Sequence, residues 1–199
     1  MPKVSEQHLA ARREQVLQAA WACFSRNGFH ATTMADVIAE SGLSAGAVYR
    51  YFDGKAALVR ATADRALGEI GGTLAELVDA AEAVHPVDVL ERILDTVDRL
   101  ATAGPTDITR VALMAWAESL RAPEIHDVTS RAMTGLRGRL AELNRRARDA
   151  GLLSPEADPD VVASATVSLV LGWVVQRHIA GVADRKAYVA AVRDLLGTV

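Results

Sequence analysis

The spacing of hydrophobic residues predicts helices along the whole chain. Apolar side chains recur at intervals of three and four residues, which places them on one face of a helix. In the first segment these positions are Leu9, Val16, Ala20 and Phe24. No segment shows the alternation of apolar and polar residues that is typical of a half-buried strand. The pattern therefore predicts an all-α fold.

Capping residues and helix breakers predict where the helices begin and end. Thr32 or Thr33, and later Ser44, are N-cap residue types, while Gly28 and Gly42 are typical stops. The predicted helices are approximately residues 6–27, 33–41, 44–52, 54–83, 87–102, 106–121, 124–150, 159–180 and 185–197. The three short helices predict an N-terminal domain, residues 1–53. The long fourth helix opens a larger helical domain, residues 54–199.

Composition and charge narrow the classes of protein. Half of the residues are hydrophobic, and the formal net charge is -3, but residues 1–65 hold eight Lys or Arg against six Asp or Glu. A slightly basic N-terminal part suits contact with a polyanion. The single cysteine, Cys23, excludes an internal disulfide and is expected in the core. With no signal-peptide pattern and no apolar run long enough for a membrane span, we expect a cytoplasmic protein with no membrane partner.

The second and third predicted helices, separated by Gly42, form a helix-turn-helix pattern. In such a motif, the first residues of the second helix lie at base edges in the major groove of DNA. Here these residues are Ala45, Gly46 and Ala47, following the predicted cap Ser44. Their small side chains let the backbone approach closely, and an alanine methyl can contact a thymine methyl. The pattern predicts a DNA-reading helix.

Larger polar side chains follow one turn later. Tyr49, Arg50 and Tyr51 can reach phosphates beside the groove, and Lys55 begins the next helix, where open N–H groups favour an anion. Each residue also has an ordinary structural alternative. The two tyrosines can pack the core of the motif, Arg50 can be a solvated charge, and Lys55 can be a surface lysine. The spacing of the whole set favours DNA.

Residues 16–58 resemble the DNA-binding domain of TetR-family transcriptional regulators. The resemblance is carried by VLQAAWACFSRNGF, ATTMADVIAESGLS and AGAVYRYFDGKAAL. It implies a homodimeric repressor that binds an inverted-repeat operator in double-stranded DNA and is released when its larger domain binds a small-molecule effector. By matching position, Thr33 caps its helix and binds phosphate, while Tyr49, Tyr51 and Lys55 hold the DNA backbone. The expected DNA-binding set is Thr33, Ser44, Ala45, Gly46, Ala47, Tyr49, Arg50, Tyr51 and Lys55.

The C-terminal two-thirds resemble the family only in length and helicity. The resemblance implies a dimer interface formed by the 124–150 and 159–180 helices, and the alternative is that they pack within one chain. The expected interface residues are Leu136, Leu140, Leu143, Ser164, Ser168 and Gly172. Apolar walls with a few polar groups are typical of ligand pockets, although they also describe helical cores. The candidate pocket residues are Met114, Trp116, Glu118, Met133, Trp173 and Gln176.

Two other classes of function remain as alternatives. The chain can be a helical dimeric ligand carrier or interaction module that has lost DNA regulation, or a small-molecule enzyme on an all-α scaffold. Residues 53–55 are similar to the end of a phosphate-binding loop, but the required first glycine and the final Ser or Thr are missing. The five histidines are scattered, with no pair at ligand spacing. We therefore expect no catalytic site, no metal and no cofactor.

Overall fold

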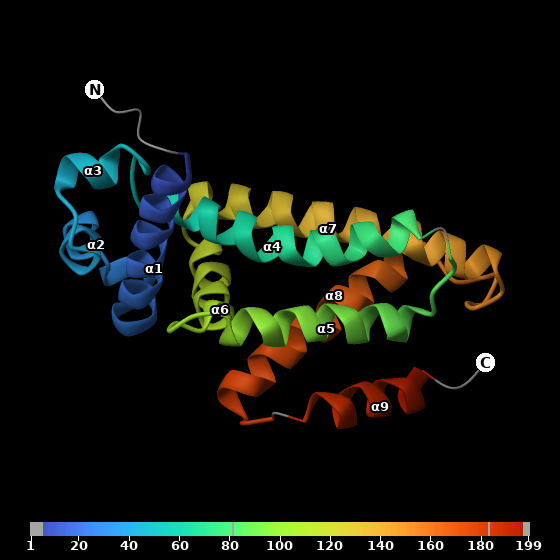
Figure 1. The fold of residues 1–199 in the computed structure, drawn as a ribbon. Helices are drawn as coiled ribbons and strands as arrows, with labels where there is room; N and C mark the ends of the chain where they lie inside the picture. The colour runs from blue at the N-terminus through green and yellow to red at the C-terminus, as the bar shows by residue number, and fades with distance from the viewer. Residues whose placement is uncertain (1–5, 81, 183, 197–199) are drawn as a thin grey trace. The chain divides into compact units, whose positions relative to one another are not determined.

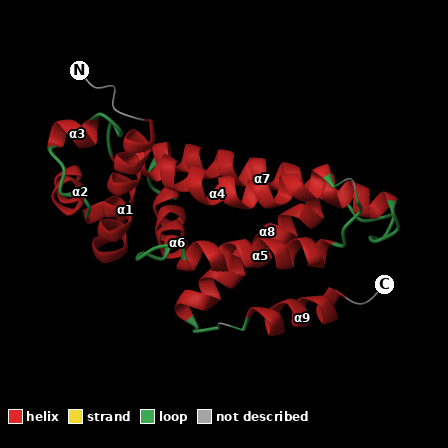
Figure 2. Cartoon of the chain, in the orientation of Figure 1, coloured by secondary structure: helices red, strands yellow, loops and turns green. Residues whose placement is uncertain are grey.

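The computed structural model describes residues 6–80, 82–182 and 184–196. Within these residues every regular element is a helix, which confirms the predicted all-α fold (Figure 2). The helices are α1 (Glu6–Ala31), α2 (Met34–Ser41), α3 (Ala45–Tyr49), α4 (Lys55–Asp79), α5 (Pro86–Thr102), α6 (Ile108–Ser119), α7 (Pro123–Asp149), α8 (Pro159–Ile179) and α9 (Arg185–Leu196). Parts of both predicted domains, residues 1–5, 81, 183 and 197–199, lie outside the described residues.

The predicted helix ends are close to the observed ones, with two corrections. Gly28 breaks α1 as expected, with φ 77° and ψ 168°, and Gly42 ends α2 with φ 66°. Helix α3 ends at Tyr49 instead of near Phe52. There Tyr51 donates its N–H to the carbonyl of Val48, three residues back, so the last turn tightens before the helix stops. Helix α4 ends at Asp79, earlier than the predicted 83.

The chain folds into two compact units. The first contains residues 1–65 and 102–130, and the second contains residues 66–101 and 131–199. All three divisions fall inside helices, since 65 and 66 are neighbours in α4, 101 and 102 in α5, and 130 and 131 in α7. Helix α6 packs against α1 and so belongs to the first unit. The functional boundary expected between residues 53 and 54 stays a prediction.

The first unit is built around α1. The apolar face of α1 is buried at Val16, Ala20 and Phe24, and the Phe24 ring stacks on Phe29 with 4.5 Å between centroids. Helix α4 is joined to α1 by a hydrogen bond, in which the indole Nε1 of Trp21 donates to Thr62 Oγ1 at 2.7 Å. A fully buried core therefore fixes the helices that carry the helix-turn-helix motif.

Cys23 lies fully buried in this core, as expected. Burial raises the pKa of its thiol, and the nearby carboxylate of Glu40 adds to the shift. A thiol in such surroundings is neutral and unreactive at physiological pH, because the thiolate is the nucleophile. Cys23 is therefore a packing residue.

The second unit is a helical bundle joined by polar contacts between its helices (Figure 1). Helices α4 and α7 lie side by side, and Arg146 Nη1 donates to the carbonyl of Val78 at 2.6 Å. Helix α8 is fastened to α7 by the buried Asn144, whose Nδ2 donates to the carbonyl of Pro159 at 3.1 Å. The Tyr188 hydroxyl of α9 donates to the carbonyl of Leu169 on α8 at 2.9 Å.

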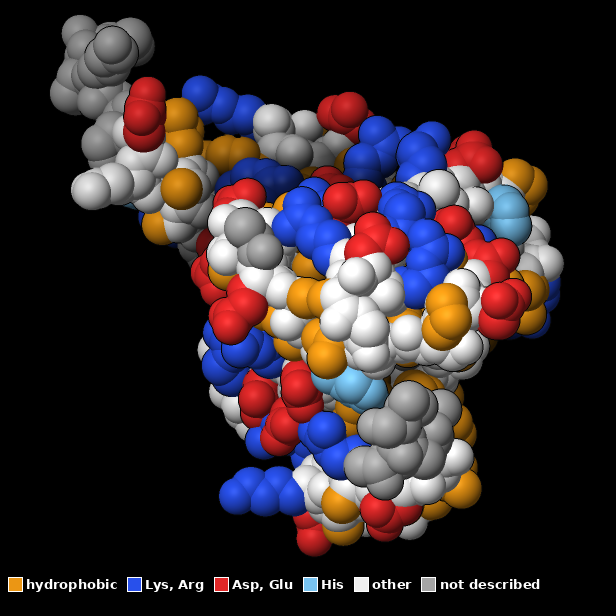
Figure 3. Space-filling view, turned by 90° about the vertical axis from the view of Figure 1, so that its right-hand side faces the viewer, with side chains coloured by type: hydrophobic (Ala, Val, Ile, Leu, Met, Phe, Trp, Pro, Cys, Tyr) orange, Lys and Arg blue, Asp and Glu red, His pale blue; other side chains and the backbone are white. Residues whose placement is uncertain are grey.

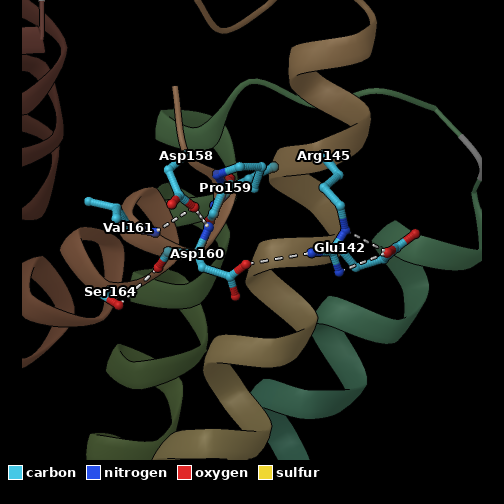
Figure 4. Close-up of polar contacts among 8 residues, drawn as sticks. Glu142, Arg145, Asp158, Pro159, Asp160, Val161 and Ser164 are labelled. Atoms are coloured by element: carbon cyan, nitrogen blue, oxygen red, sulfur yellow. Dashed lines mark hydrogen bonds and ion pairs between the residues drawn. The ribbon is translucent and has the colours of Figure 1, made fainter. Parts of the chain in front are cut away.

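The start of α8 shows how local chemistry sets a helix end. Asp158 is the N-cap, and one of its carboxylate oxygens accepts the N–H groups of Asp160 and Val161 (Figure 4). Pro159 occupies the first turn, where its missing N–H removes no helical bond. Arg145 of α7 lies between Glu142 and Asp160, at 3.2 and 3.8 Å, so it links the two helices (Figure 4).

Charged side chains also hold α9 against α5. Arg193 pairs with Asp88 at 2.6 Å, and Arg185 pairs with Asp95 and Asp98. Positive and negative side chains are interspersed over the face shown in Figure 3, so that face carries no single-sign patch.

Among the described residues, α8 alone has the length and mean hydropathy, 1.3, of a membrane span. One face of α8 is buried within the second unit, and Arg177 of α8 pairs with Asp98 of α5.

Candidate nucleic-acid interface

Thr33 begins α2 with a reciprocal cap. Its hydroxyl accepts the N–H of Asp36 at 3.2 Å and donates to Asp36 Oδ2 at 2.8 Å, while its own N–H donates to the same oxygen at 2.8 Å. These bonds, the backbone one first, hold the pKa of the Asp36 carboxyl below its usual range. The predicted cap is thus present, and the proton of its hydroxyl is already bonded to Asp36.

The first three residues of helix α3 have small side chains or none. Ser44 caps it by accepting the N–H of Ala47 at 3.3 Å. Ala45 and Gly46 are exposed and Ala47 is half-buried, whereas Val48 is fully buried against the motif core. Nothing lies within 4 Å of the position that a side chain at Gly46 would occupy. A DNA base edge can therefore approach the backbone here.

The large polar residues after this surface are available to a ligand. Tyr49 is 47% exposed, Arg50 is exposed and Tyr51 is half-buried. Within the described part of the chain, no hydrogen bond or ion pair involves these three side chains. Three unpaired donors beside a surface of small residues are suited to phosphate groups flanking a groove.

Lys55 has a different environment from the one expected. Its ammonium donates to the carbonyls of Phe29, His30 and Thr32, at 2.9, 3.1 and 3.0 Å. The same nitrogen lies 5.3 Å from the centroid of the Phe29 ring. The structure therefore brings Lys55 to the C-terminal end of α1, and its three N–H groups all have protein partners.

Two residues of this region were missed by sequence reasoning. Asp36 completes the cap of Thr33, and the Thr-x-x-Asp spacing is a signal that identifies such a pair. Gln15 of α1 donates from Nε2 to the carbonyl of Ser41 at 2.7 Å and so holds the end of α2. No local pattern identifies that contact, because it joins residues 26 apart.

In the described residues, no three His, Cys, Asp or Glu side chains gather where they can hold a metal ion.

Comparison with known proteins decides which family has this arrangement. Residues 16–62 match the family described as "Bacterial regulatory proteins, tetR family", and residues 86–199 match "BetI-type transcriptional repressor, C-terminal". The chain belongs to the TetR family. The "HTH-type transcriptional repressor Rv1474c" of Mycobacterium tuberculosis is 30% identical over 202 residues, which cover 98% of this chain and 96% of the relative.

Solved structures show the same TetR-family fold. GusR of Salmonella enterica superposes with a TM-score of 0.75 at 23% identity, covering 98% of this chain and 97% of that one. A complex of SmeT with triclosan has a TM-score of 0.70 at 24% identity and covers 85% of this chain and 81% of SmeT. The predicted architecture, an N-terminal helix-turn-helix domain followed by a helical C-terminal domain, is confirmed. The protein is a DNA-binding transcriptional regulator of the TetR family.

Of the expected dimer residues, only those on α8 are accessible in this TetR-family chain. Leu136, Leu140 and Leu143 of α7 are buried within the chain. Ser168 is exposed, and Ser164 and Gly172 are half-buried, so these three positions of α8 are at least partly accessible. An interface that uses α7 therefore has to use its other, exposed face.

The candidate pocket residues are divided between the two units. Met114, Trp116 and Glu118 lie on α6, in the first unit, and Glu118 faces His30 and Arg121 at 3.9 and 3.7 Å. The others, Met133, Trp173 and Gln176, lie in the second unit. Whether this set lines one pocket stays a prediction.

Trp173 has one feature that the sequence does not show. Its ring is fully buried and lies 5.1 Å from the Tyr188 ring, and its indole Nε1 has no hydrogen-bond partner among the described residues. A buried donor without a partner is rare in native proteins, and an ordered water or another bound group would satisfy it.

Proposed function

We propose that this protein is a homodimeric repressor that binds an inverted-repeat operator and leaves it when a small molecule binds. The observation that carries the proposal is the exposed start of α3, where small residues adjoin three unpaired polar side chains. Ala45, Gly46 and Ala47 would lie at base edges, and Tyr49, Arg50 and Tyr51 would contact phosphates. Thr33 and Ser44 would order the two helices through their caps.

A stripe along α8 supports the dimer. Its members recur at alternating intervals of four and three residues, the spacing of a helix that packs along another helix. All are exposed except half-buried Gly172, and three are large and apolar, with Val161 64%, Val175 38% and Ile179 79% exposed. The stripe consists of Val161, Ala165, Ser168, Gly172, Val175 and Ile179. Its small central residues allow the α8 helices of two copies to cross closely.

An unpaired buried donor supports a small-molecule effector. Trp173 Nε1 is a buried donor without a partner, and the Trp173 ring lies beside the tilted Tyr188 ring, so an apolar effector with one hydrogen-bond acceptor would fit this chemistry. SmeT, which shares the fold, is found in complex with triclosan.

The relatives are bacterial transcription regulators, which act on DNA. We therefore propose a cytoplasmic location for this chain.

Selection of DNA from a random duplex library tests the proposed function. The parent protein is expected to enrich a sequence with two-fold symmetry, because a dimer of helix-turn-helix motifs contacts two half-sites about one or more helical turns apart. The matched control is a variant with Tyr49→Phe and Arg50→Ala, which removes two exposed donors without touching the buried core. It should bind the same operator more weakly with unchanged base preference, since phosphate contacts carry no sequence information. Enrichment of no symmetric sequence by the parent would contradict the proposal.

A further inference from the structure

Lys55 is the first residue of α4, yet its ammonium lies at the end of α1. The helix α1 is broken at Gly28, and the chain then turns through Phe29, His30 and Thr32 to reach α2. The C-terminal end of a helix leaves carbonyl groups without helical partners. Two carbonyls of the last turn, those of Phe29 and His30, and the carbonyl of Thr32 just beyond the helix converge on Lys55 Nζ, at 2.9 to 3.1 Å. One cation therefore bonds to three carbonyls at the end of α1 and the start of the following turn.

The geometry suits lysine in particular. An ammonium has three N–H groups in a tripod and no acceptor, so three carbonyls use all of its donors. The partial negative charges of carbonyl groups at a helix end favour a cation at the same place. The Phe29 ring, 5.3 Å from the nitrogen, adds a further favourable surface. A phosphate would have to take an N–H from one of these carbonyls, and that carbonyl would then lose its partner.

The residues that Lys55 holds lead directly into the DNA-reading motif. Thr32 is buried and donates from Oγ1 to the carbonyl of Gly28 at 2.7 Å, and Thr33, the next residue, caps α2. Lys55 thus fastens the first turn of α4 to the corner between α1 and α2. The position of α2 and α3 relative to the start of α4 depends on this corner.

We propose that Lys55 is a positioning residue, which sets the helix-turn-helix motif through the carbonyls of Phe29, His30 and Thr32 and makes no phosphate contact. The proposal rests on the proposed function, because positioning matters only if the motif reads DNA. It differs from the role that the TetR-family resemblance implies for this position. The two roles make different predictions for charge, salt dependence and accessibility.

Variants of Lys55 separate the roles by salt dependence. A phosphate contact contributes about 0.9 to the slope of log affinity against log salt for each protomer bound. For Lys55→Met, we expect several-fold weaker binding to the selected operator and a smaller ratio of operator affinity to random-duplex affinity. The slope of log affinity against log salt should equal that of the parent. Arg50→Met, which removes an exposed cation without a partner in the described chain, should lower the slope. A less steep dependence on salt for Lys55→Met, or an unchanged operator affinity, would overturn the proposal.

Lys55→Arg is the second variant, because it keeps the charge and changes the geometry. A planar guanidinium cannot aim three convergent N–H groups as an ammonium does. We expect Lys55→Arg to lose operator affinity as Lys55→Met does. Full affinity in Lys55→Arg would show that charge alone matters and would contradict a positioning role. Unfolding curves of both variants confirm that the fraction folded is the same at the temperature of the binding assay.

The unmodified protein provides a test that no unfolded variant can compromise. The chain has only three lysines, Lys3, Lys55 and Lys186, and Lys186 is exposed on α9. Acetylation followed by mass spectrometry should label Lys186 readily and Lys55 slowly, equally with and without DNA. Labelling of Lys55 as fast as Lys186, with protection by DNA, would identify a phosphate contact and overturn the proposal. Absence of any operator binding by the parent would instead refute the proposed function, so the two failures are distinguishable.

Discussion

At the scale of single residues, the start of α2 depends on one hydroxyl and one carboxylate. Thr33 and Asp36 exchange three hydrogen bonds, all between 2.8 and 3.2 Å. The pair satisfies N–H groups that a helix end leaves open, and it commits the Thr33 hydroxyl to the protein. Phosphate binding by Thr33, which the family resemblance implies, would therefore compete with Asp36 for that proton.

Removal of the Thr33 hydroxyl, which caps α2, should lower the free energy of unfolding. Thr33→Ala is expected to lower the free energy of unfolding by about 1 kcal/mol, the typical effect of losing an N-cap side chain. Thr33→Ser keeps the hydroxyl and should stay close to the parent. Urea unfolding at one protein concentration measures both, since a dimer's stability depends on concentration. Equal losses in the two variants would show that the methyl group matters rather than the cap.

The lowered pKa of Asp36 predicts a dependence on pH. A carboxyl whose pKa is lower in the folded state contributes stability above its unfolded pKa, near about 3.9, and loses it as the pH falls through the folded value. We therefore expect the parent to exceed Asp36→Asn in free energy of unfolding at neutral pH, by a margin that shrinks below about pH 4. Unfolding of both proteins across this range measures the margin. A margin independent of pH would contradict the assigned hydrogen bonds.

At the scale of helices, the three glycines of α4 are not equivalent. All lie within one continuous helix, Lys55–Asp79. Gly71 is buried beneath the guanidinium of Arg139, which occupies the place that a Cβ atom would take. Gly68 and Gly72 face open space. Gly71 therefore lets α7 approach α4 closely, while the other two serve no packing contact.

Alanine substitutions should reveal this difference. Gly72→Ala is expected to raise the free energy of unfolding by roughly 1 kcal/mol, since alanine is the stronger helix former and has room there. Gly71→Ala should raise it less, because Arg139 has to move. Gly68→Ala provides a second exposed position for comparison. Denaturant unfolding of the three variants gives the order, and an equal gain at 71 and 72 would show that Arg139 yields freely.

At the scale of the whole molecule, the exposed α8 stripe predicts how two copies meet. Ser168 lies at its centre, among small residues. Ser168→Arg is expected to convert the dimer to a monomer and to weaken operator binding, because a long charged side chain holds the two helices apart. Leu195→Arg is the matched control, since Leu195 is 86% exposed on α9 and lies off the stripe. Sedimentation at micromolar concentration distinguishes the forms, and a dimeric Ser168→Arg would place the interface elsewhere.

Local chemistry in the sequence accounted for much of the fold and part of the site. The caps Thr33 and Ser44 and the breaks at Gly28 and Gly42 depend on residues within a turn of each other, so they were predictable. The partners of Lys55 and Gln15 lie 23 to 26 residues away, and they follow from the packing of helices that no local pattern specifies. Burial of Leu136, Leu140 and Leu143 has the same origin, since an apolar stripe does not say which helix covers it.

The first unit has a consequence for the order in which the protein is made. It is assembled from two separate stretches of chain, residues up to 65 and residues 102–130. A ribosome delivers the chain from its N-terminus at about 5–20 residues per second. The surface of α1 that contacts α6 therefore stays uncovered by α6 while α2, α3, α4 and α5 are synthesised. The DNA-reading part of this regulator, although encoded before α4, α5 and α6, completes its packing only after residues 108–119 have been translated.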